Sequence, residues 1–184
     1  LKIAITLPNS IETNRPDLNQ SLRDAIKELV KNAIKELVDF RTQEGDSLKK
    51  DLLNNVDLIQ KKLALLKKLA PERIKLVKER IKKNLEELKI DLELNRFEQE
   101  LIYHLEKLDI NEELVRLKNH LIFFKKTVND KQIEKGKKLT FISQEIGREI
   151  NTIGSKSNHL LMQQTVVEMK NELEKIKEQL LNVL

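Results

Sequence analysis

The sequence predicts a mainly α-helical protein that contains a long antiparallel helical hairpin, a C-terminal bundle of helices and one short N-terminal β-strand. Composition is the first observation behind this prediction. Charged residues make up 35% and hydrophobic residues 39% of the 184 residues, but aromatic residues only 3%, with four glycines and three prolines. Such a mixture is typical of long amphipathic helices and not of a sheet protein. The second observation is the spacing of the apolar residues, which recur every three or four positions over most of the chain.

The N-terminal end departs from this spacing. Apolar residues alternate with polar or small ones over residues 1–7, which predicts a half-buried β-strand. A single strand has no partner for its backbone hydrogen bonds, so we expect its neighbours in another part of the protein or in another subunit. A break around Pro16 ends the segment. We therefore interpret residues 1–17 as the end of an N-terminal β-containing domain.

Residues 18–108 are predicted to form the helical hairpin arm. An apolar seam runs from about residue 18 to residue 69 with a spacing close to that of a straight helix. Pro71 is expected to end this helix and to begin the next, because proline suits the first turn of a helix and not its interior. The second helix would return antiparallel to the first. A turn at residues 91–95 would then lead into a short helix at residues 97–108.

The tip of the predicted hairpin carries a basic segment, Lys61–Lys83. It contains ten basic residues and two acidic ones, Glu72 and Glu79, whereas the whole chain has a net charge of +5. Such a segment attracts phosphate backbones without regard to base sequence. A solvated helix face that binds nothing has the same composition, so the segment by itself leaves both interpretations open.

The C-terminal domain, residues 109–184, is predicted to be a bundle of helices. Its first helix begins at Asp109–Glu112, which has the spacing of a capping box. Glu113, Arg116 and His120 then line one edge of the apolar face of that helix. A histidine at such an edge is often an ordinary boundary residue, and Glu113 with Arg116 has the spacing of a plain ion pair within a helix.

The helix predicted at Gly136–Lys156 has the most distinctive polar side. Its apolar face carries five residues at helical spacing, namely Leu139, Ile142, Ile146, Ile150 and Ile153. One polar stripe follows the edge of this face and consists of Lys138, Glu145 and Glu149. A second stripe lies further round the helix and consists of Gln144, Arg148 and Asn151. Amide, guanidinium and carboxylate groups are therefore expected side by side.

By themselves these side chains predict no more than a helical protein that could bind RNA, although the groups they carry also have catalytic potential. Glu145 and Glu149 lie one helical turn apart and could together hold a hard cation such as Mg²⁺ or Mn²⁺. Such an ion can activate water and offset charge on the phosphodiester. His120 could move a proton. The groups suited to hold phosphates are Arg148, Lys138 and Lys156. Carboxylates at this spacing also occur on ordinary helices, so the stripe is equally compatible with a structural role.

The sequence lacks the patterns that are typical of several other kinds of site. It has no cysteine, no glycine-rich nucleotide-binding loop and no zinc-binding spacing. The absence of cysteine fits a reducing compartment. No apolar run approaches the length of a transmembrane helix, and no signal peptide opens the sequence. We expect a cytoplasmic protein with no membrane segment and no small-molecule cofactor.

Several segments of residues 109–182 match one family pattern. Gly136–Phe141 is similar to G-R-K-L-D-F, Gln144–Thr152 to Q-E-x-N-R-E-x-N-T, and Ser155–Lys156 to S-K. Upstream, Asp109–His120 is similar to D-I-x-E-E-L-x-R-L-x-x-H, and downstream Val166–Lys170 reads V-V-E-M-K. In this pattern the sequence resembles the YicC/YloC family of bacterial endoribonucleases.

The resemblance implies metal-dependent cleavage of structured or small RNA by a ring-like homo-oligomer, a hexamer. The residues that it makes catalytic candidates are Glu113, His120, Glu145 and Glu149, of which Glu145 and Glu149 would hold Mg²⁺ or Mn²⁺. The candidates for RNA binding are Arg116, Lys137, Lys138, Gln144, Arg148, Asn151 and Lys156.

Departures from the family pattern occur within the matched segments, of which two matter most, and at the N-terminal end of the sequence. Lys137 replaces an arginine, and Thr140 stands where the family usually has an aspartate. The family also has a longer segment before the point where this sequence begins, so we expect the sequence to be part of a longer chain. These departures favour an alternative prediction, a non-catalytic RNA-binding or oligomerisation helical module.

Overall fold

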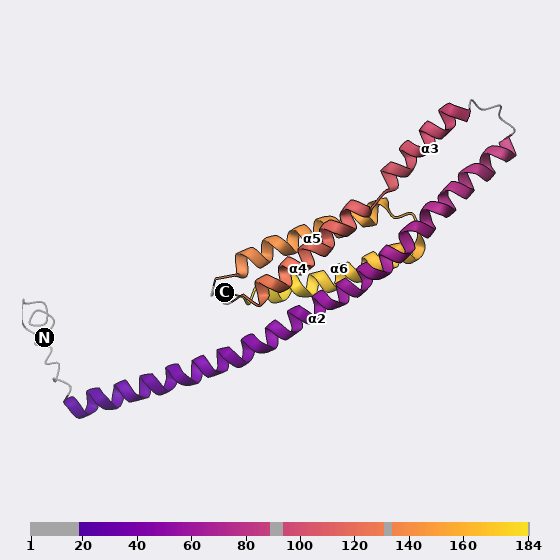
Figure 1. Cartoon of the computed structure of the whole chain (residues 1–184). Coiled ribbons are helices and arrows are strands. Elements are labelled where there is room, and N and C mark those ends of the chain that lie inside the picture. Colours follow the sequence, from indigo (N-terminus) through magenta and orange to yellow (C-terminus); the bar gives the residue numbers. More distant parts are fainter. Residues whose placement is uncertain (1–18, 89–93, 131–133, 184) are drawn as a thin grey trace, which may run out of the picture. The chain divides into compact units, whose positions relative to one another are not determined.

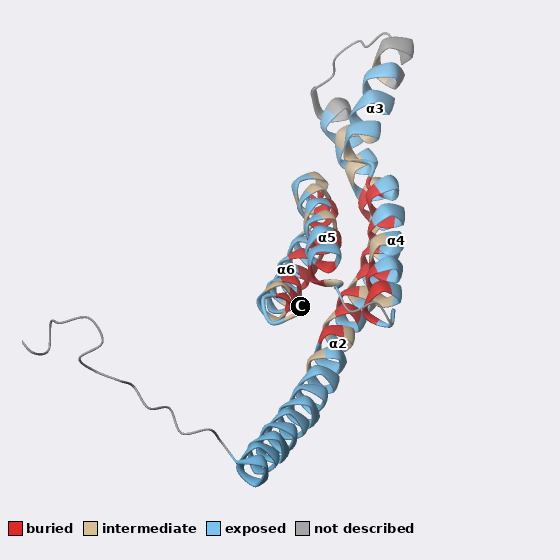
Figure 2. Ribbon diagram, turned by 90° about the vertical axis from the view of Figure 1, so that its left-hand side faces the viewer, coloured by how far each residue is buried: buried red, intermediate tan, exposed pale blue. Residues whose placement is uncertain are grey.

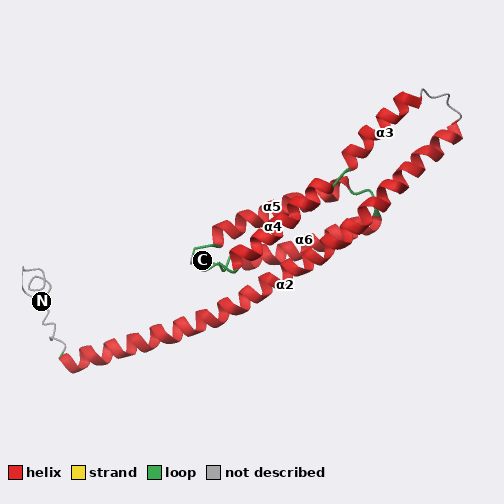
Figure 3. Cartoon of the chain, viewed as in Figure 1, coloured by secondary structure: helices red, strands yellow, loops and turns green. Residues whose placement is uncertain are grey.

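The computed structural model describes residues 19–88, 94–130 and 134–183, and all regular secondary structure in these ranges is helical (Figure 3). The helices are α2 (Gln20–Leu88), α3 (Leu94–Leu108), α4 (Asn111–Val128), α5 (Gly136–Lys156) and α6 (Leu160–Leu180) (Figure 1). The prediction of a mainly helical fold is confirmed. The strand predicted at residues 1–7 lies outside the described residues. None of the described helices combines the length and the apolarity that crossing a bilayer requires.

The chain divides into two compact units, residues 1–45 and residues 46–184. In the first unit, the side-chain oxygen of Asn19 accepts a hydrogen bond from the backbone N–H of Leu22 at 2.8 Å, which caps the start of α2. Every residue from 20 to 45 is exposed, including the apolar seam around Leu29 and Phe40 (Figure 2). No described residue of this unit covers that seam. The domain boundaries predicted at 17/18 and 108/109 stay predictions.

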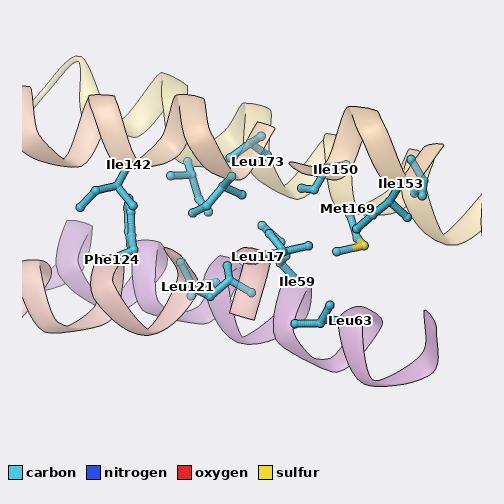
Figure 4. Close-up of a cluster of buried hydrophobic side chains, with 14 of the residues drawn as sticks. Ile59, Leu63, Leu117, Leu121, Phe124, Ile142, Ile150, Ile153, Met169 and Leu173 are labelled. Atoms are coloured by element: carbon cyan, nitrogen blue, oxygen red, sulfur yellow. The ribbon is translucent and has the colours of Figure 1, made fainter. Parts of the chain in front are cut away.

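The hydrophobic core lies in the second unit, where α2, α4, α5 and α6 contribute apolar side chains to one cluster. Ile59 of α2, Leu117 of α4, Ile150 of α5 and Met169 of α6 lie together in it (Figure 4). The five apolar positions predicted for the face of α5 are all buried. The 3.6-residue period therefore identified the buried side of these helices correctly.

The predicted break at Pro71 is wrong, because α2 continues as a helix through Pro71 to Leu88. Proline in a helix interior removes one backbone hydrogen bond and crowds the preceding turn, at a cost of about 3 kcal/mol. Packing on both sides of the proline offsets this cost, since Leu66 before it and Arg73 after it are both fully buried against the rest of the unit. Tertiary contacts thus override the local preference.

The second half of α2 nevertheless has an antiparallel partner, formed by α3 and α4. Lys125 of α4 pairs with Asp57 of α2 and also donates a hydrogen bond to Gln60 at 2.8 Å. Further along α2, Arg73 donates a hydrogen bond to the carbonyl of Leu108 at the end of α3. Residues later in α2 therefore lie beside residues earlier in the α3–α4 segment, which makes the two antiparallel. The antiparallel partner therefore begins with α3 at Leu94, after α2 has ended at Leu88, and not at Pro71.

Two glycines allow α5 and α6 to approach each other closely. A Cβ atom on Gly147 would lie 3.2 Å from Leu173 Cδ2, and one on Gly154 would lie 3.0 Å from Val166 Cγ1. Both distances are shorter than ordinary van der Waals contact. One side of α5 is therefore committed to α6, which leaves the opposite edge for α4.

Candidate active site

The polar edges of α4 and α5 meet along a seam between the two antiparallel helices. At one end, the Lys156 ammonium lies 2.7 Å from a carboxylate oxygen of Glu113. At the other, the Lys138 ammonium lies 5.0 Å from the centroid of the Phe123 ring. Next to the second contact, Phe124 of α4 and Ile142 of α5 point toward each other (Figure 4).

This register determines which candidates share the seam. Arg116 and His120 lie between the two contacts on the facing edge of α4, and Glu145 and Glu149 lie between them on the facing edge of α5. We infer that these four side chains flank one another across the seam. The sequence placed them on two separate helix edges, and the packing brings those edges together.

The two glutamates of α5 have different surroundings. The Glu145 side chain is 19% exposed and lies 3.4 Å from the Arg148 guanidinium. Glu149 is only 6% exposed, and among the described residues no hydrogen bond or ion pair reaches its carboxylate. Burial removes water from an ionised carboxylate, which is costly unless a cation or a hydrogen-bond donor replaces it. The carboxylate oxygens of Glu149 keep some contact with solvent, so a hydrated cation could reach them at the edge of the seam.

Glu113, which is buried, and Lys156, which is partly exposed, form an ion pair at one end of the seam. Lys156 also donates a hydrogen bond to the backbone carbonyl of Asp109 at 2.9 Å, which ties the end of α5 to the start of α4. The second carboxylate oxygen of Glu113, Oε2, is buried without a hydrogen-bond partner among the described residues. That oxygen is a free acceptor beside the seam, whereas the ammonium of Lys156 is already engaged.

Arg73 supports this end of the seam from α2. Its side chain is 2% exposed and donates hydrogen bonds to the carbonyl of Leu108, the last residue of α3, and to that of Lys156, the last residue of α5, at 2.7 Å for the latter. Carbonyls at helix ends have no partner within the helix, so Arg73 satisfies one at each of two ends. Burial lowers the pKa of Arg73, and the Asp109 carboxylate opposes that shift. The guanidinium stays protonated at neutral pH.

The other candidates lie on the outer face of α5, away from α4 and α6. Lys137, Gln144, Arg148 and Asn151 are all exposed there. Arg148 also reaches Glu145, so it connects this face with the seam. The predicted site residues therefore form two sets, one in the seam and one on the outer face.

Two of the α4 candidates differ in their surroundings. Arg116 is exposed and pairs with Glu112, whereas Glu113 pairs with Lys156, so the plain Glu113–Arg116 ion pair that the spacing allowed is not formed. His120 is half-buried. An exposed guanidinium and a half-buried imidazole at one helix edge suit contact with an anion that approaches from solvent.

The basic segment Lys61–Lys83 is only partly available to a ligand. Lys62 pairs with Glu168 of α6, and Arg73 is buried. Its exposed basic residues are Lys61, Lys67, Lys68, Lys75, Lys78, Arg80, Lys82 and Lys83. The segment thus gives α2 an exposed cationic side, whereas its Arg73 is buried and holds helix ends together.

The described residues contain no group of three or more His, Asp or Glu side chains close enough to surround a metal ion. Mg²⁺ does not require such a group, because it commonly keeps several waters and takes one or two carboxylates together with substrate phosphates. The two carboxylates of Glu145 and Glu149, one of them buried and without a partner, fit that smaller requirement.

Sequence reasoning missed the role of Arg73. A signal was present, because Arg73 follows the buried Leu66 by seven residues and so lies on the same face of α2. The basic composition around it suggested phosphate binding instead. Neither helix by itself contains a signal that predicts which end of α5 meets which end of α4.

The fold and the seam define a class of protein, a helical bundle with a carboxylate-containing polar seam and a cationic surface. Residues 66–184 match the family model described as "Endoribonuclease YicC-like, C-terminal". The chain belongs to this family.

Two curated relatives agree with the family match. The chain is 35% identical over 170 residues to "Probable endoribonuclease YicC" of Clostridioides difficile (strain 630), covering 90% of this chain and 55% of the relative. It is 29% identical over 178 residues to the protein of the same name from Haemophilus influenzae (strain ATCC 51907 / DSM 11121 / KW20 / Rd), covering 96% of this chain and 61% of that relative. The chain thus spans little more than half the length of these relatives.

Proposed function

We propose that this chain is the helical part of a metal-dependent endoribonuclease that acts on structured or small RNA in the cytoplasm. The observation that carries the proposal is the Glu149 carboxylate, which has no ion pair or hydrogen bond among the described residues and lies one helical turn from Glu145, on the edge of α5 that faces the edge of α4 with Arg116 and His120. The names of the two relatives support the reaction class.

In this proposal Glu145 and Glu149 hold a divalent cation, Mg²⁺ or Mn²⁺, which activates water and offsets charge on the phosphodiester when bound. Arg116 and Lys138 approach the phosphate from the two helices that form the seam. His120, half-buried at the same edge, moves a proton to or from the reacting oxygen. Glu113 accepts the Lys156 ammonium and so holds the end of α5 against α4.

The test is a cleavage assay on a labelled structured RNA, with and without Mn²⁺ or Mg²⁺, for this chain and for the full-length protein that contains it. Glu145→Gln/Glu149→Gln should lower kcat by about 100-fold or more, because a metal ion contributes several kcal/mol and each 1.4 kcal/mol is ten-fold. RNA affinity should stay within about two-fold of the parent, a change worth roughly 0.4 kcal/mol.

The matched control is Glu174→Gln/Glu178→Gln, which changes two exposed glutamates at the same spacing on α6. It should leave cleavage unchanged. Isothermal titration with Mn²⁺ gives a readout that does not depend on activity, and the seam variant should lose heat of binding that the α6 variant keeps. Equal loss of cleavage in both variants would contradict the metal assignment.

A non-catalytic RNA-binding module is the second candidate, because Thr140 is exposed on α5 at the position where the family usually has aspartate. Tight RNA binding without cleavage, for the full-length protein with either metal, would establish this candidate in place of the nuclease. Thr140→Asp is the informative variant, since restored cleavage in it would assign the loss to that one position.

We also propose a homo-oligomer, a hexamer, as the active form. The exposed apolar seam of α2 within residues 20–45 supports self-association, because contiguous apolar surface of this kind marks an interaction site. Sedimentation of the full-length protein tests it. Leu29→Glu should lower the sedimenting mass, whereas Glu28→Gln, an exposed neighbour, should not; an unchanged mass for Leu29→Glu would remove this seam from the interface.

A further inference from the structure

A hollow of about 410 Å³ lies where α5 begins and α6 ends. Lys137, Thr140, Phe141 and Gln144 line it from α5, and Leu180 and Leu181 line it from the end of α6. Its volume falls in the range of small-molecule sites in proteins, which is roughly 300–1,000 Å³, but the hollow is wide open to solvent and is a shallow surface site. It is separate from the α4–α5 seam, because Lys137 and Gln144 lie on the outer face of α5.

Phe141 is the feature of this hollow that most needs an explanation. Its side chain is 62% exposed in a chain where aromatic residues are only 3% of the total. An exposed ring at the wall of a hollow offers a flat surface to a planar ligand. Nucleobases stack on such rings, and this contact tolerates any base because every base has a π-face.

The entrance of the hollow favours an anion. The first turn of α5 contains Lys137 and Lys138 but no acidic residue, and no side chain caps its free N–H groups. The start of a helix carries a positive partial charge, so a phosphate placed there is stabilised by both the dipole and Lys137, whereas Lys138 lies on the α4 side over Phe123. Among the described residues, no ion pair engages the Lys137 ammonium.

Lys137, Phe141 and Gln144 follow one another at i, i+4 and i+7, and Arg148 and Asn151 continue the same stripe along the outer face. Cation, ring, amide, cation and amide therefore alternate over about 20 Å of helix, at 1.5 Å per residue. A second protein chain would favour a continuous apolar stripe, whereas single-stranded nucleic acid favours cations interleaved with a ring.

We infer that this hollow holds one nucleotide of a single-stranded RNA segment. The base stacks on Phe141 and meets the Gln144 amide, the phosphate lies at Lys137 and the start of α5, and the strand continues along Arg148 and Asn151. The inference rests on the proposed function, since it specifies how the substrate strand reaches the seam beside Arg148 and Glu145.

The experiment measures the affinity of the full chain for a fluorescent single-stranded uridine oligomer of about ten nucleotides, a typical single-strand site size. It uses the Glu145→Gln/Glu149→Gln background, so that cleavage does not interfere. Phe141→Leu, which keeps apolar bulk but removes the ring, should raise Kd about ten-fold. Phe141→Trp, which keeps a ring, should stay within about two-fold of the parent.

Tyr103→Leu is the matched control, since Tyr103 is an aromatic residue of α3 that is 55% exposed and distant in sequence from the hollow. It should leave Kd unchanged. Lys137→Gln should reduce the dependence of log Kd on log salt by about one phosphate contact. Affinity for a perfect RNA duplex should not respond to Phe141→Leu, because its bases are already stacked.

The outcomes separate the possibilities. Absence of RNA binding by the parent would overturn the proposed function, whereas binding that Phe141→Leu leaves unchanged would overturn the inference alone. A uridine monophosphate that competes as well as the oligomer would replace a strand site by a mononucleotide site. A change in sedimenting mass on Phe141→Leu, with RNA affinity unchanged, would assign the hollow to a second copy of the chain.

Discussion

Replacing Arg73 by methionine tests whether this buried side chain holds α3, α5 and α2 together. The change removes two hydrogen bonds from a charged donor and leaves the carbonyls of Leu108 and Lys156 without that partner at half-buried helix ends. Each unsatisfied buried group costs about 1–3 kcal/mol. Part of this cost is offset, because the substitution also removes the guanidinium charge, which is unfavourable to bury. We expect a net destabilisation of about 2–4 kcal/mol.

The measurement is equilibrium unfolding in urea followed by circular dichroism. For a chain of this size, a loss of about 2–4 kcal/mol corresponds to a Tm lower by roughly 5–15 °C. Arg73→Lys keeps the charge, but a single ammonium cannot reproduce the planar fork that reaches two carbonyls, so it should lose about half as much as Arg73→Met. Arg80→Met is the matched control, because Arg80 lies exposed in the same helix.

The reasoning would be refuted if Arg73→Met and Arg80→Met destabilised the chain equally, within about 0.5 kcal/mol. An unchanged m-value in urea is part of the test, since a change in m would indicate an altered unfolded state instead of a lost contact.

Three further predictions follow from single contacts. Gly154→Ala should lower the free energy of unfolding by about 1 kcal/mol, because its Cβ would lie 3.0 Å from Val166. Gly45→Ala should raise the free energy of unfolding by about 1 kcal/mol, because its Cβ would meet nothing within 4 Å. Thermal unfolding of both variants tests the pair, and a stabilised Gly154→Ala would contradict the packing. Pro71→Ala should raise the free energy of unfolding by about 1–3 kcal/mol, because it restores a hydrogen bond inside α2, and a less stable variant in urea would show that the proline is required there. His120→Gln should lower kcat for RNA cleavage by about 100-fold at unchanged RNA affinity, and equal losses in kcat and affinity would make His120 a binding residue.

Local pattern predicted more of the fold than of the site. The apolar period identified the buried faces of α4, α5 and α6, and the same period on α2 correctly included Ile59 and Leu66. The prediction failed at Pro71, because packing on both sides of the proline outweighed its local tendency to end a helix. For the site, the sequence predicted a polar edge on α4 and another on α5, but it did not predict that the two edges face each other.

Helical periodicity is carried by neighbouring positions, so local pattern was enough to predict most helical segments and the apolar side of each core helix, and it failed at Pro71. The contact of the Glu113 carboxylate with Lys156, 43 residues away, and the hydrogen bonds of Arg73 to two helix ends arise only when the helices pack. Such contacts depend on the register between helices. That register results from the packing of all four core helices at once, so no single helix contains it.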